Sequence, residues 1–390
     1  MSHHRAIAAV FAAHGAVAGS LSTRIPWIQE HLHLSPGTLG LALLCPSIGA
    51  FVGMPMAGRL AYHFGNRAAT RALLALWCAG LALPALAPSP VWLFGAFLLF
   101  GAAAGMCDVA MNAHAVVLER HLGRSIMSGL HGMWSVGSLA AGGVGALAAH
   151  AGVDARIHLG AMSLALLGLG AAAGRGLLPD SGMAGSVPDA PPPRRFALPT
   201  RAILAIGLVG FCATFAEGAS SNWAAVYLTA VADAGPGLAA AGYTVFMLCM
   251  ASARLLGDRV IRRLGPVATV RAGGALAAVG GALVVAARTP ALGIAGFALV
   301  GLGVALIVPL VIAAAGNAGT TPGEGVAGVA TITYMSGLIA PAVTGWVAGA
   351  LSYPAAFAMI TGVVVLLTLL APVLRPSPTS QPEGAVRVDV

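Results

Sequence analysis

Three charged side chains stand inside long apolar runs of this sequence: Arg24, Asp108 and Glu217. A charge at the centre of a bilayer costs about 2.5–3.5 kcal/mol on insertion scales, and a helix that only has to span would carry Leu instead. Charges kept at such positions usually face a water-filled cavity, where they bind a solute or carry a proton. We therefore expect the function to depend on these three residues.

Asp108 and Asn112 are four residues apart, so their side chains share one face of a helix. Gly101 and Gly105 lie on the same face, where they allow another helix to pack closely. The two polar side chains would then lie in a small recess beside this helix contact. A carboxylate there can accept hydroxyl groups of a sugar-like solute, take up a proton or bind an Arg. We expect a binding or coupling role, against the alternative of a buried Asp–Arg pair that only fixes helix packing.

Arg24 is a possible cation for Asp108, but the two residues differ in depth. Asp108 falls near the middle of its apolar run, and Arg24 lies toward the outer end of the first run. At about 1.5 Å per residue this difference exceeds what a side chain easily bridges. Two other roles remain open for Arg24. It can line an outer vestibule and attract carboxylate or phosphate groups, or it can snorkel to the outer interface.

Glu217 is the only acid in the core of the C-terminal half, and we expect a binding or coupling role for it too. Asn222 and Trp223 follow about a turn further out. There, Trp223 either stacks on a planar group of the solute or anchors its helix at the interface. His131 and Trp134 are one turn apart in another run. Because His131 is shallow, we expect it to serve gating or packing rather than coupling.

The composition indicates that these charges are surrounded by lipid-facing helices. Of the 390 residues, 58% are hydrophobic and only 8% are charged, and the mean hydropathy is +0.89. A soluble domain carries about 25% charged residues. Since a spanning helix needs about 20 mostly apolar residues, the length accommodates about a dozen. The sequence predicts an all-α polytopic membrane protein with twelve transmembrane helices in two pseudo-symmetric six-helix bundles.

Turn and charge signals delimit the twelve predicted spans. They are 5–29, 36–62, 70–87, 91–120, 125–149, 157–174, 201–231, 237–262, 267–287, 290–316, 323–350 and 353–374. A Pro-rich polar segment in the middle has the composition of a linker, and it separates six spans from six, as in transporters built from two parallel repeats. The predicted organisation is a first bundle at 1–174, a cytoplasmic linker at 175–200, a second bundle at 201–374 and a disordered tail at 375–390.

All 20 basic residues are Arg, and most are assigned to every second connection between spans, Arg254 and Arg259 among them. This asymmetry follows the positive-inside rule and predicts that both termini are cytoplasmic. No aromatic–basic interleaving points to nucleic acid. The five Cys lie singly in apolar runs without a CxxC pair, so we expect neither a metal site nor a cofactor.

Two short basic segments occupy equivalent places in the two halves, one after the second span and one after the eighth. We interpret them as cytoplasmic gate loops, whose residues are Gly58, Arg59, Gly65 and Arg67 in the first half and Gly257, Asp258 and Arg262 in the second. Their symmetric placement favours a shared role. They resemble G-x-x-x-D-x-x-G-R-R, the loop signature of the major facilitator superfamily.

In that family the Asp of the signature helps to hold the cytoplasmic gate shut by charge pairing. Here Tyr62 and Arg262 stand at the Asp position. The resemblance therefore implies a gate that lacks this acid. Asp258 could pair with a neighbouring Arg, although an exposed ion pair contributes little.

The run from Arg24 to Ile28, RIPWI, resembles the fucose-permease-like branch of the superfamily, and within it the YbjJ-like inner-membrane proteins. The spacing of Asp108 and Asn112 is similar to that branch as well, and the resemblance covers nearly the whole chain. It implies a monomeric secondary transporter in the bacterial inner membrane that moves a small solute by alternating access, coupled to protons. The acid that fucose permeases carry in the first helix is Ser22 here, which argues against fucose itself.

Two directions of transport remain open. Proton symport of a small polar or sugar-like solute fits the resemblance, whereas export of an amphipathic compound fits a mostly apolar cavity. An enzyme is not expected, because the sequence contains no GxSxG, HExxH or phosphate-binding loop, and we assign no catalytic residue. The expected partners are a small-molecule solute, protons and the lipid bilayer.

Overall fold

The computed structural model describes residues 2–34, 36–180, 200–234, 236–318 and 322–375, and these residues form helices without a single strand. The predicted linker and tail fall mostly on 181–199 and 376–390, which lie outside the described residues. The first half contains α1 (His3–Ser22), α2 (Ile25–His31), α3 (Pro36–Phe64), α4 (Asn66–Ala79), η1 (Gly80–Leu86), α5 (Pro90–Leu122), α6 (Met127–His150) and α7 (Ala155–Arg175).

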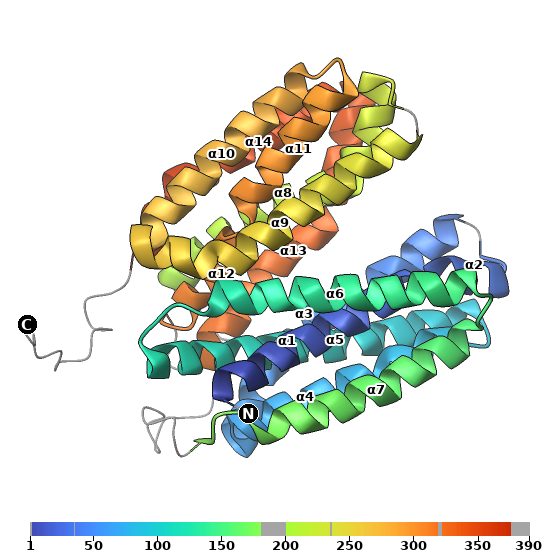
Figure 1. Cartoon of the computed structure of the whole chain (residues 1–390), viewed down its shortest axis with the longest axis vertical. Coiled ribbons are helices and arrows are strands. Elements are labelled where there is room, and N and C mark those ends of the chain that lie inside the picture. The colour runs from blue at the N-terminus through green and yellow to red at the C-terminus, as the bar shows by residue number, and fades with distance from the viewer. Residues whose placement is uncertain (1, 35, 181–199, 235, 319–321, 376–390) are drawn as a thin grey trace, which may run out of the picture.

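The second half contains α8 (Arg201–Ala232), α9 (Pro236–Leu264), α10 (Pro266–Ala286), α11 (Pro290–Val304), α12 (Ile307–Ala315), α13 (Pro322–Ala350), α14 (Tyr353–Leu370) and η3 (Ala371–Leu374). Figure 1 shows the two halves as two separate bundles, with α1 to α7 in the lower one and α8 to α14 in the upper one. The predicted all-α architecture of two six-helix bundles is confirmed.

The helix bounds of the two bundles repeat after 200 residues. Helix α3 runs from Pro36 to Phe64 and α9 from Pro236 to Leu264, and α5 and α11 begin at Pro90 and Pro290. The connections correspond too, because Gly65 and Gly265 both adopt positive φ angles, 81° and 75°, where a side chain would be strained. The two basic segments are therefore structurally equivalent.

These segments are helical, however, so the prediction that they are loops is wrong, whereas their role in a gate stays a prediction. Gly58 and Arg59 belong to α3, and Arg67 belongs to α4. In the second half Gly257, Asp258 and Arg262 belong to α9. Only Gly65 and Gly265 interrupt the helices. The change from apolar to basic composition marks where each helix leaves the apolar layer, and the helix itself continues to the next Gly.

Eleven helical stretches of the described chain are long and apolar enough to cross a membrane. They cover every predicted span except the eighth, which corresponds to α9. This helix has 29 residues, but its last turns carry five charged residues, namely Arg254, Asp258, Arg259, Arg262 and Arg263. Because α9 is the equivalent of α3, we count it as the twelfth spanning helix.

Two predicted spans are each divided in two, and each division lies a few residues before a Pro. The first span separates into α1 and α2 at Thr23 and Arg24, just before Pro26. The tenth separates into α11 and α12 near Ala305, and Pro309 follows four residues later. Since Pro has no N–H, the carbonyl four residues upstream loses its helical partner.

The two bundles contact each other at one end of the molecule, which we call the joined end. It is formed by the first residues of α6, the last turns of α9, and α12. The contacts are made mainly by α6 with α9 and by α3 with α13. Figure 1 shows the bundles diverging from the joined end toward the opposite end, where α2 lies.

Within each bundle, helices approach closely at glycines. A Cβ atom at Gly101 would lie 1.9 Å from the carbonyl oxygen of Pro46, and one at Gly301 would lie 2.5 Å from that of Phe246. Both partners of the second contact lie 200 residues after those of the first, so α3–α5 and α9–α11 use the same seam. By contrast, a Cβ atom at Gly95 of α5 would meet nothing within 4 Å.

We expect the Gly101→Ala variant to unfold at a lower temperature than the parent, because the added methyl group meets the backbone of α3. Overpacking of this kind costs about 1–3 kcal/mol. The matched control is Gly95→Ala in the same helix, which adds the same group in open space and improves helix propensity. Thermal unfolding in detergent, followed by Trp fluorescence, measures both variants. Equal midpoints would contradict the close approach.

Candidate functional site

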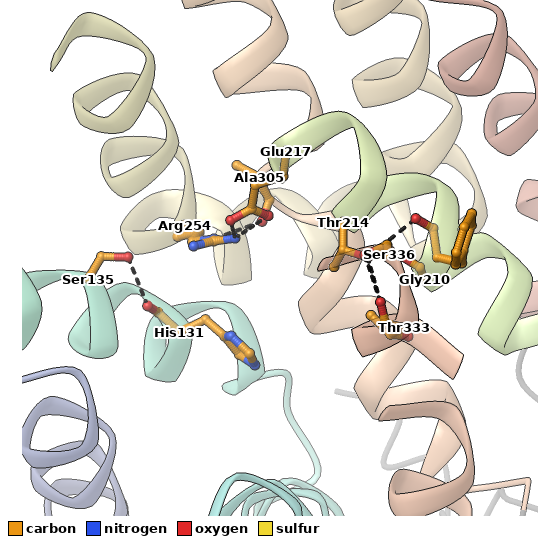
Figure 2. A network of polar contacts seen from close by, with 10 residues as sticks. His131, Ser135, Gly210, Thr214, Glu217, Arg254, Ala305, Thr333 and Ser336 are labelled. Atoms are coloured by element: carbon orange, nitrogen blue, oxygen red, sulfur yellow. Dashed lines mark hydrogen bonds and ion pairs between the residues drawn. The ribbon is translucent and has the colours of Figure 1, made fainter. Parts of the chain in front are cut away.

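Glu217, midway along α8, forms an ion pair with Arg254 of α9 (Figure 2). Nη2 of Arg254 donates hydrogen bonds to both carboxylate oxygens, at 3.0 and 3.2 Å. The side chain of Arg254 is 6% exposed and that of Glu217 is 26% exposed. The guanidinium of Arg254 is thus buried, whereas part of the Glu217 side chain is accessible. Removing either partner would leave a buried or partly buried charge uncompensated.

Pro309 gives Arg254 its second partner. The proline has no N–H to offer the carbonyl of Ala305, four residues earlier, and the helix divides there. Nε of Arg254 donates to this free carbonyl at 3.2 Å. Glu217 and Ala305 together satisfy two faces of one buried guanidinium, as Figure 2 shows.

The sequence interpretation assigned Arg254 to a connecting segment, and this assignment is wrong. Arg254 lies inside α9 and is buried, whereas Arg259 and Arg262, further along the helix, are exposed. One signal was available in the sequence. Arg254 is flanked by Ala253 and Leu255, whereas the other two lie among charged residues.

In the first bundle, Asp108, Asn112 and His131 form a connected polar cluster. Nδ2 of Asn112 donates to Oδ1 of Asp108 at 3.1 Å and to the Asp108 carbonyl at 2.8 Å. Oδ1 of Asn112 then accepts from Nε2 of His131 at 3.2 Å, which assigns the proton of the ring to Nε2. The predicted helix face of Asp108 and Asn112 is therefore present, and α6 adds His131 to it.

Tyr334, from α13 of the second bundle, approaches the carboxyl group of Asp108 with its hydroxyl group. Asp108 is half-buried and Tyr334 is 38% exposed, so the contact is accessible. The described residues contain two ion pairs, Arg254–Glu217 and Arg156–Asp154, and neither involves Asp108. Asp108 is thus held by neutral hydrogen-bonding groups from both bundles. The alternative of a buried Asp–Arg pair does not describe it.

His131 lies between the two clusters. It bonds to Asn112 on one side, and on the other it faces Arg254. Figure 2 shows His131 on α6 opposite the Glu217–Arg254 pair. Asp108 and Glu217 therefore belong to two polar clusters, one in each bundle, with His131 between them.

The N-terminus of α6 is held by one carboxylate from each bundle. Glu119 of α5 accepts from the N–H groups of Ile126 and Met127, at 2.8 and 3.0 Å. Asp258 of α9 accepts from those of Ser128 and Gly129, at 3.0 and 2.9 Å. All four N–H groups that a helix start leaves unpaired are satisfied, and two negative charges face the positive end of the helix dipole.

Asp258 therefore joins the two bundles, but it does so by binding backbone N–H groups and not the expected Arg. The sequence suggested a weak, exposed pair with an Arg. Instead the carboxylate binds backbone N–H groups across the interface, four residues before Arg262, the position equivalent to the signature Asp. A Cβ atom at Gly129 would lie 2.6 Å from Oδ2 of Asp258, so this close approach requires Gly there.

Further hydrogen bonds cross the joined end. Oγ of Ser128 donates to the carbonyl of Arg254 at 2.7 Å. Nη1 of Arg262 donates to the carbonyl of Ser125 at 3.2 Å. Arg120 of α5 donates to Gly316 and Asn317 at the end of α12, where helix carbonyls lack partners. Arg254 thus contacts Glu217 through its side chain and the opposite bundle through its backbone.

Arg24 lies apart from both clusters. It precedes α2, is 3% exposed, and its Nε donates to Nδ1 of His158 on α7 at 3.2 Å. A hydrogen bond from Arg156 lowers the pKa of Asp154 to about 2, and this carboxylate supplies a negative charge near Arg24. Neither lining of an exposed vestibule nor snorkelling describes a side chain buried inside the first bundle.

Of the other predicted residues, the two Trp make packing contacts and Asn222 does not. Trp223 lies against Gly345, with its ring 6.2 Å from that of Tyr353, and Asn222 is exposed. Nε1 of Trp134 donates to Nδ1 of His14 at 3.0 Å. Among the described residues no group of His, Cys, Asp and Glu could hold a metal ion.

Sequence reasoning missed Tyr334, Ser128 and the hydroxyl pair Thr214–Ser336 that Figure 2 shows near Glu217. Single hydroxyl residues occur in many membrane helices, where most of them bond to their own backbone. Thr214 bonds to the carbonyl of Gly210, four residues earlier, and also to that of Thr333 on α13. Only the packing of two helices shows which hydroxyl groups also bond to a neighbouring helix, and the sequence does not contain that information.

A sequence profile of the Major Facilitator Superfamily matches residues 7–319 and 206–389. An uncharacterised MFS-type transporter of Yersinia pestis is 36% identical over 89% of this chain and 88% of its own length. An uncharacterised transporter of Sinorhizobium fredii is 31% identical over 95% and 98%. The fold is similar to that of FucP in its outward conformation, with a TM-score of 0.77 at 16% identity over 96% and 99%. FucP is the fucose:proton symporter of E. coli.

We expect Asp258→Ala to separate the bundles at the joined end, because two N–H groups of α6 lose a charged acceptor. Each such bond contributes about 1.5–3 kcal/mol, so the separated population should rise about tenfold or more. Spin-label distances between the ends of α6 and α9 measure this population in a Cys-free background. Glu30→Gln, an exposed acid of α2, is the control. Unchanged distances in Asp258→Ala would refute the assigned role.

The Glu217–Arg254 pair should show strong thermodynamic coupling. We expect Glu217→Gln and Arg254→Gln each to lower the unfolding midpoint, and the double variant to lose less than the sum, with a coupling of about 0.5–3 kcal/mol. The exposed pair Asp154–Arg156, substituted in the same way, is the control and should show weaker coupling. Additive losses at Glu217 and Arg254 would mean that the buried pair does not form.

Proposed function

This chain belongs to the Major Facilitator Superfamily, whose members are transporters, and from this premise we propose that it is a proton-coupled importer of a small polar, sugar-like solute. The observation that supports the proposal is the unequal state of two carboxyl groups. Glu217 is bound to a cation, whereas Asp108 is held only by neutral groups. The likeness to a fucose:proton symporter supports the same class of solute.

Asp108 is our candidate for the proton carrier. A carboxyl group without a cation, surrounded by apolar helices, is stable in its neutral form and accepts a proton at little cost. Protonation turns one of its oxygens from an acceptor into a donor. Because Asn112 and Tyr334 approach this group from different bundles, a change at Asp108 alters a contact between the bundles.

Glu217 is our candidate for solute binding. Arg254 donates to both oxygens of its carboxylate, and because a carboxylate offers about four lone-pair sites, about two remain for other donors. The side chain is 26% exposed, so the remaining sites are accessible to solute hydroxyl groups. His131, which bonds to the buried Asn112, lies opposite the Glu217–Arg254 pair and completes the candidate binding surface.

We propose that the joined end is cytoplasmic, that both termini are cytoplasmic, and that the described state faces outward. The distribution of Arg supports this orientation, and so does the likeness to FucP in its outward conformation. The bundles, residues 1–174 and 201–374, would then rock about the polar clusters. Inward opening would break the bonds of Asp258 to α6.

The bacterial sources of the similar transporters support a place in the inner membrane, and the complete pair of bundles supports a working monomer. Export of an amphipathic compound is the second candidate. No contact among the described residues favours it over import, so the transport assay decides between the two directions.

The decisive experiment begins with a thermal-shift screen of the purified protein against sugars, organic acids and amphipathic drugs, which supplies a transported solute. We expect Asp108→Asn to lose accumulation driven by a pH gradient in proteoliposomes while retaining solute exchange at equal concentrations. The loss should be about 100-fold, as for other removed proton-transfer groups. Glu217→Gln should weaken both activities, and Glu30→Gln, at an exposed acid of α2, should change neither.

Two results would contradict the proposal. If Asp108→Asn still accumulates solute in proportion to the pH gradient, Asp108 is not the coupling group. If the parent protein moves the solute only out of the cytoplasmic side while protons flow in the opposite direction, the protein is an exporter.

A further inference from the structure

A cavity of about 170 Å³ lies between the two bundles at the joined end. Arg124 lines it from the first bundle, and Arg259 and Arg262 line it from the second. His4, at the start of α1, and Asp258 complete its polar wall. Three guanidinium groups and one carboxylate thus line a cavity whose walls come from both bundles.

The carboxylates near this cavity are already engaged. Asp258 accepts from the N–H groups of Ser128 and Gly129, and Glu119, close by, accepts from two more at the start of α6. Arg262 donates to the carbonyl of Ser125. Arg124 and Arg259 donate no hydrogen bond to any residue that the structure describes. The cavity therefore holds an excess of positive charge and two guanidinium groups with unused donors.

The equivalent interface, between α3 and α13, has a different charge pattern. A Cβ atom at Gly58 would lie 3.8 Å from Gly323, so the two helices meet there as α9 and α6 do in the other interface. The residue 200 positions after Arg124 is Glu324, in the first turn of α13. One interface thus carries its own acid at a position where the other carries an Arg.

We propose that the cavity binds a phosphate-type oxyanion, which bridges Arg124 of one bundle and Arg259 of the other. The planar guanidinium group matches phosphate oxygens with paired hydrogen bonds, and an anion removes the repulsion between Arg side chains of opposite bundles. Two sources supply this chemistry: the headgroup of an anionic phospholipid, and free inorganic phosphate. At a membrane surface a basic cluster of this kind attracts anionic headgroups.

Because its ligands come from both bundles, the anion binds only while the bundles are joined. A ligand that binds one of two states shifts the population toward that state. The anion therefore stabilises the joined conformation, which on the proposed orientation is the outward-facing one. Binding itself does not depend on proton coupling or on the transported solute, so failure of the proposed transport mechanism leaves this inference standing.

The test uses the full chain in nanodiscs and reads the midpoint of thermal unfolding. In the first arm, phosphatidylcholine nanodiscs are titrated with inorganic phosphate, against chloride at equal ionic strength. In the second arm, phosphatidylglycerol replaces part of the phosphatidylcholine. We expect a saturable rise of the midpoint in one arm, which identifies the source as free phosphate or as lipid headgroup. No rise beyond chloride in the first arm, and none in the second, would overturn the proposal.

Variants locate the site. We expect the double variant Arg124→Gln/Arg259→Gln to need about tenfold more anion for half-saturation, which corresponds to about 1.4 kcal/mol. The control is Arg201→Gln, an exposed Arg at the start of α8 outside the cavity, and it should respond like the parent. A double variant that responds like the parent, or a control that loses the response equally, would show general surface attraction and overturn the proposed site.

Discussion

Arg254 connects four parts of this structure, and the rest of the site depends on how its charge is satisfied. Its guanidinium binds Glu217 of α8 and the carbonyl of Ala305, and its own carbonyl accepts from Ser128 of the opposite bundle. A buried Arg without an acid would be strongly unfavourable, and a free carbonyl without a donor would be costly as well. Glu217, the division of the helix before Pro309 and the seam with α6 are therefore mutually required.

This arrangement separates two tasks that a single carboxylate performs poorly. A group that carries a proton must exist in two charge states at similar cost, whereas a group that binds hydroxyls benefits from a fixed charge. Glu217 is paired with the cation Arg254. Asp108 has no cation and is held by an amide and a phenol. His131, which bonds to Asn112, lies between the cluster of Asp108 and the ion pair of Glu217, and these belong to different bundles.

The sequence was sufficient for the architecture and for part of the site. Hydropathy and the position of Arg predicted the spans, and the spacing of Asp108 and Asn112 predicted their shared face. The partner of Glu217 was not predictable, because pairing with Arg254 depends on how two helices pack. The role of Asp258 was hidden for another reason: it binds backbone N–H groups, which every residue carries. The predicted spans 36–62 and 237–262 agree closely with α3 and α9, and the error was to interpret their basic ends as loops.

Helices of the second bundle match helices of the first when the numbering is shifted by 200 residues, but the charged residues of the two bundles do not match. The positions equivalent to Asp108, Glu217 and Arg254 are Val308, Val17 and Met54. Two bundles of equal construction can pack at either end with similar energy, which is what alternating access requires. A symmetric scaffold gives no preference for one solute or one charge carrier. That preference must come from the residues that differ between the bundles. Among them are the charged residues Asp108, Glu217 and Arg254, whose placement within the bilayer costs free energy.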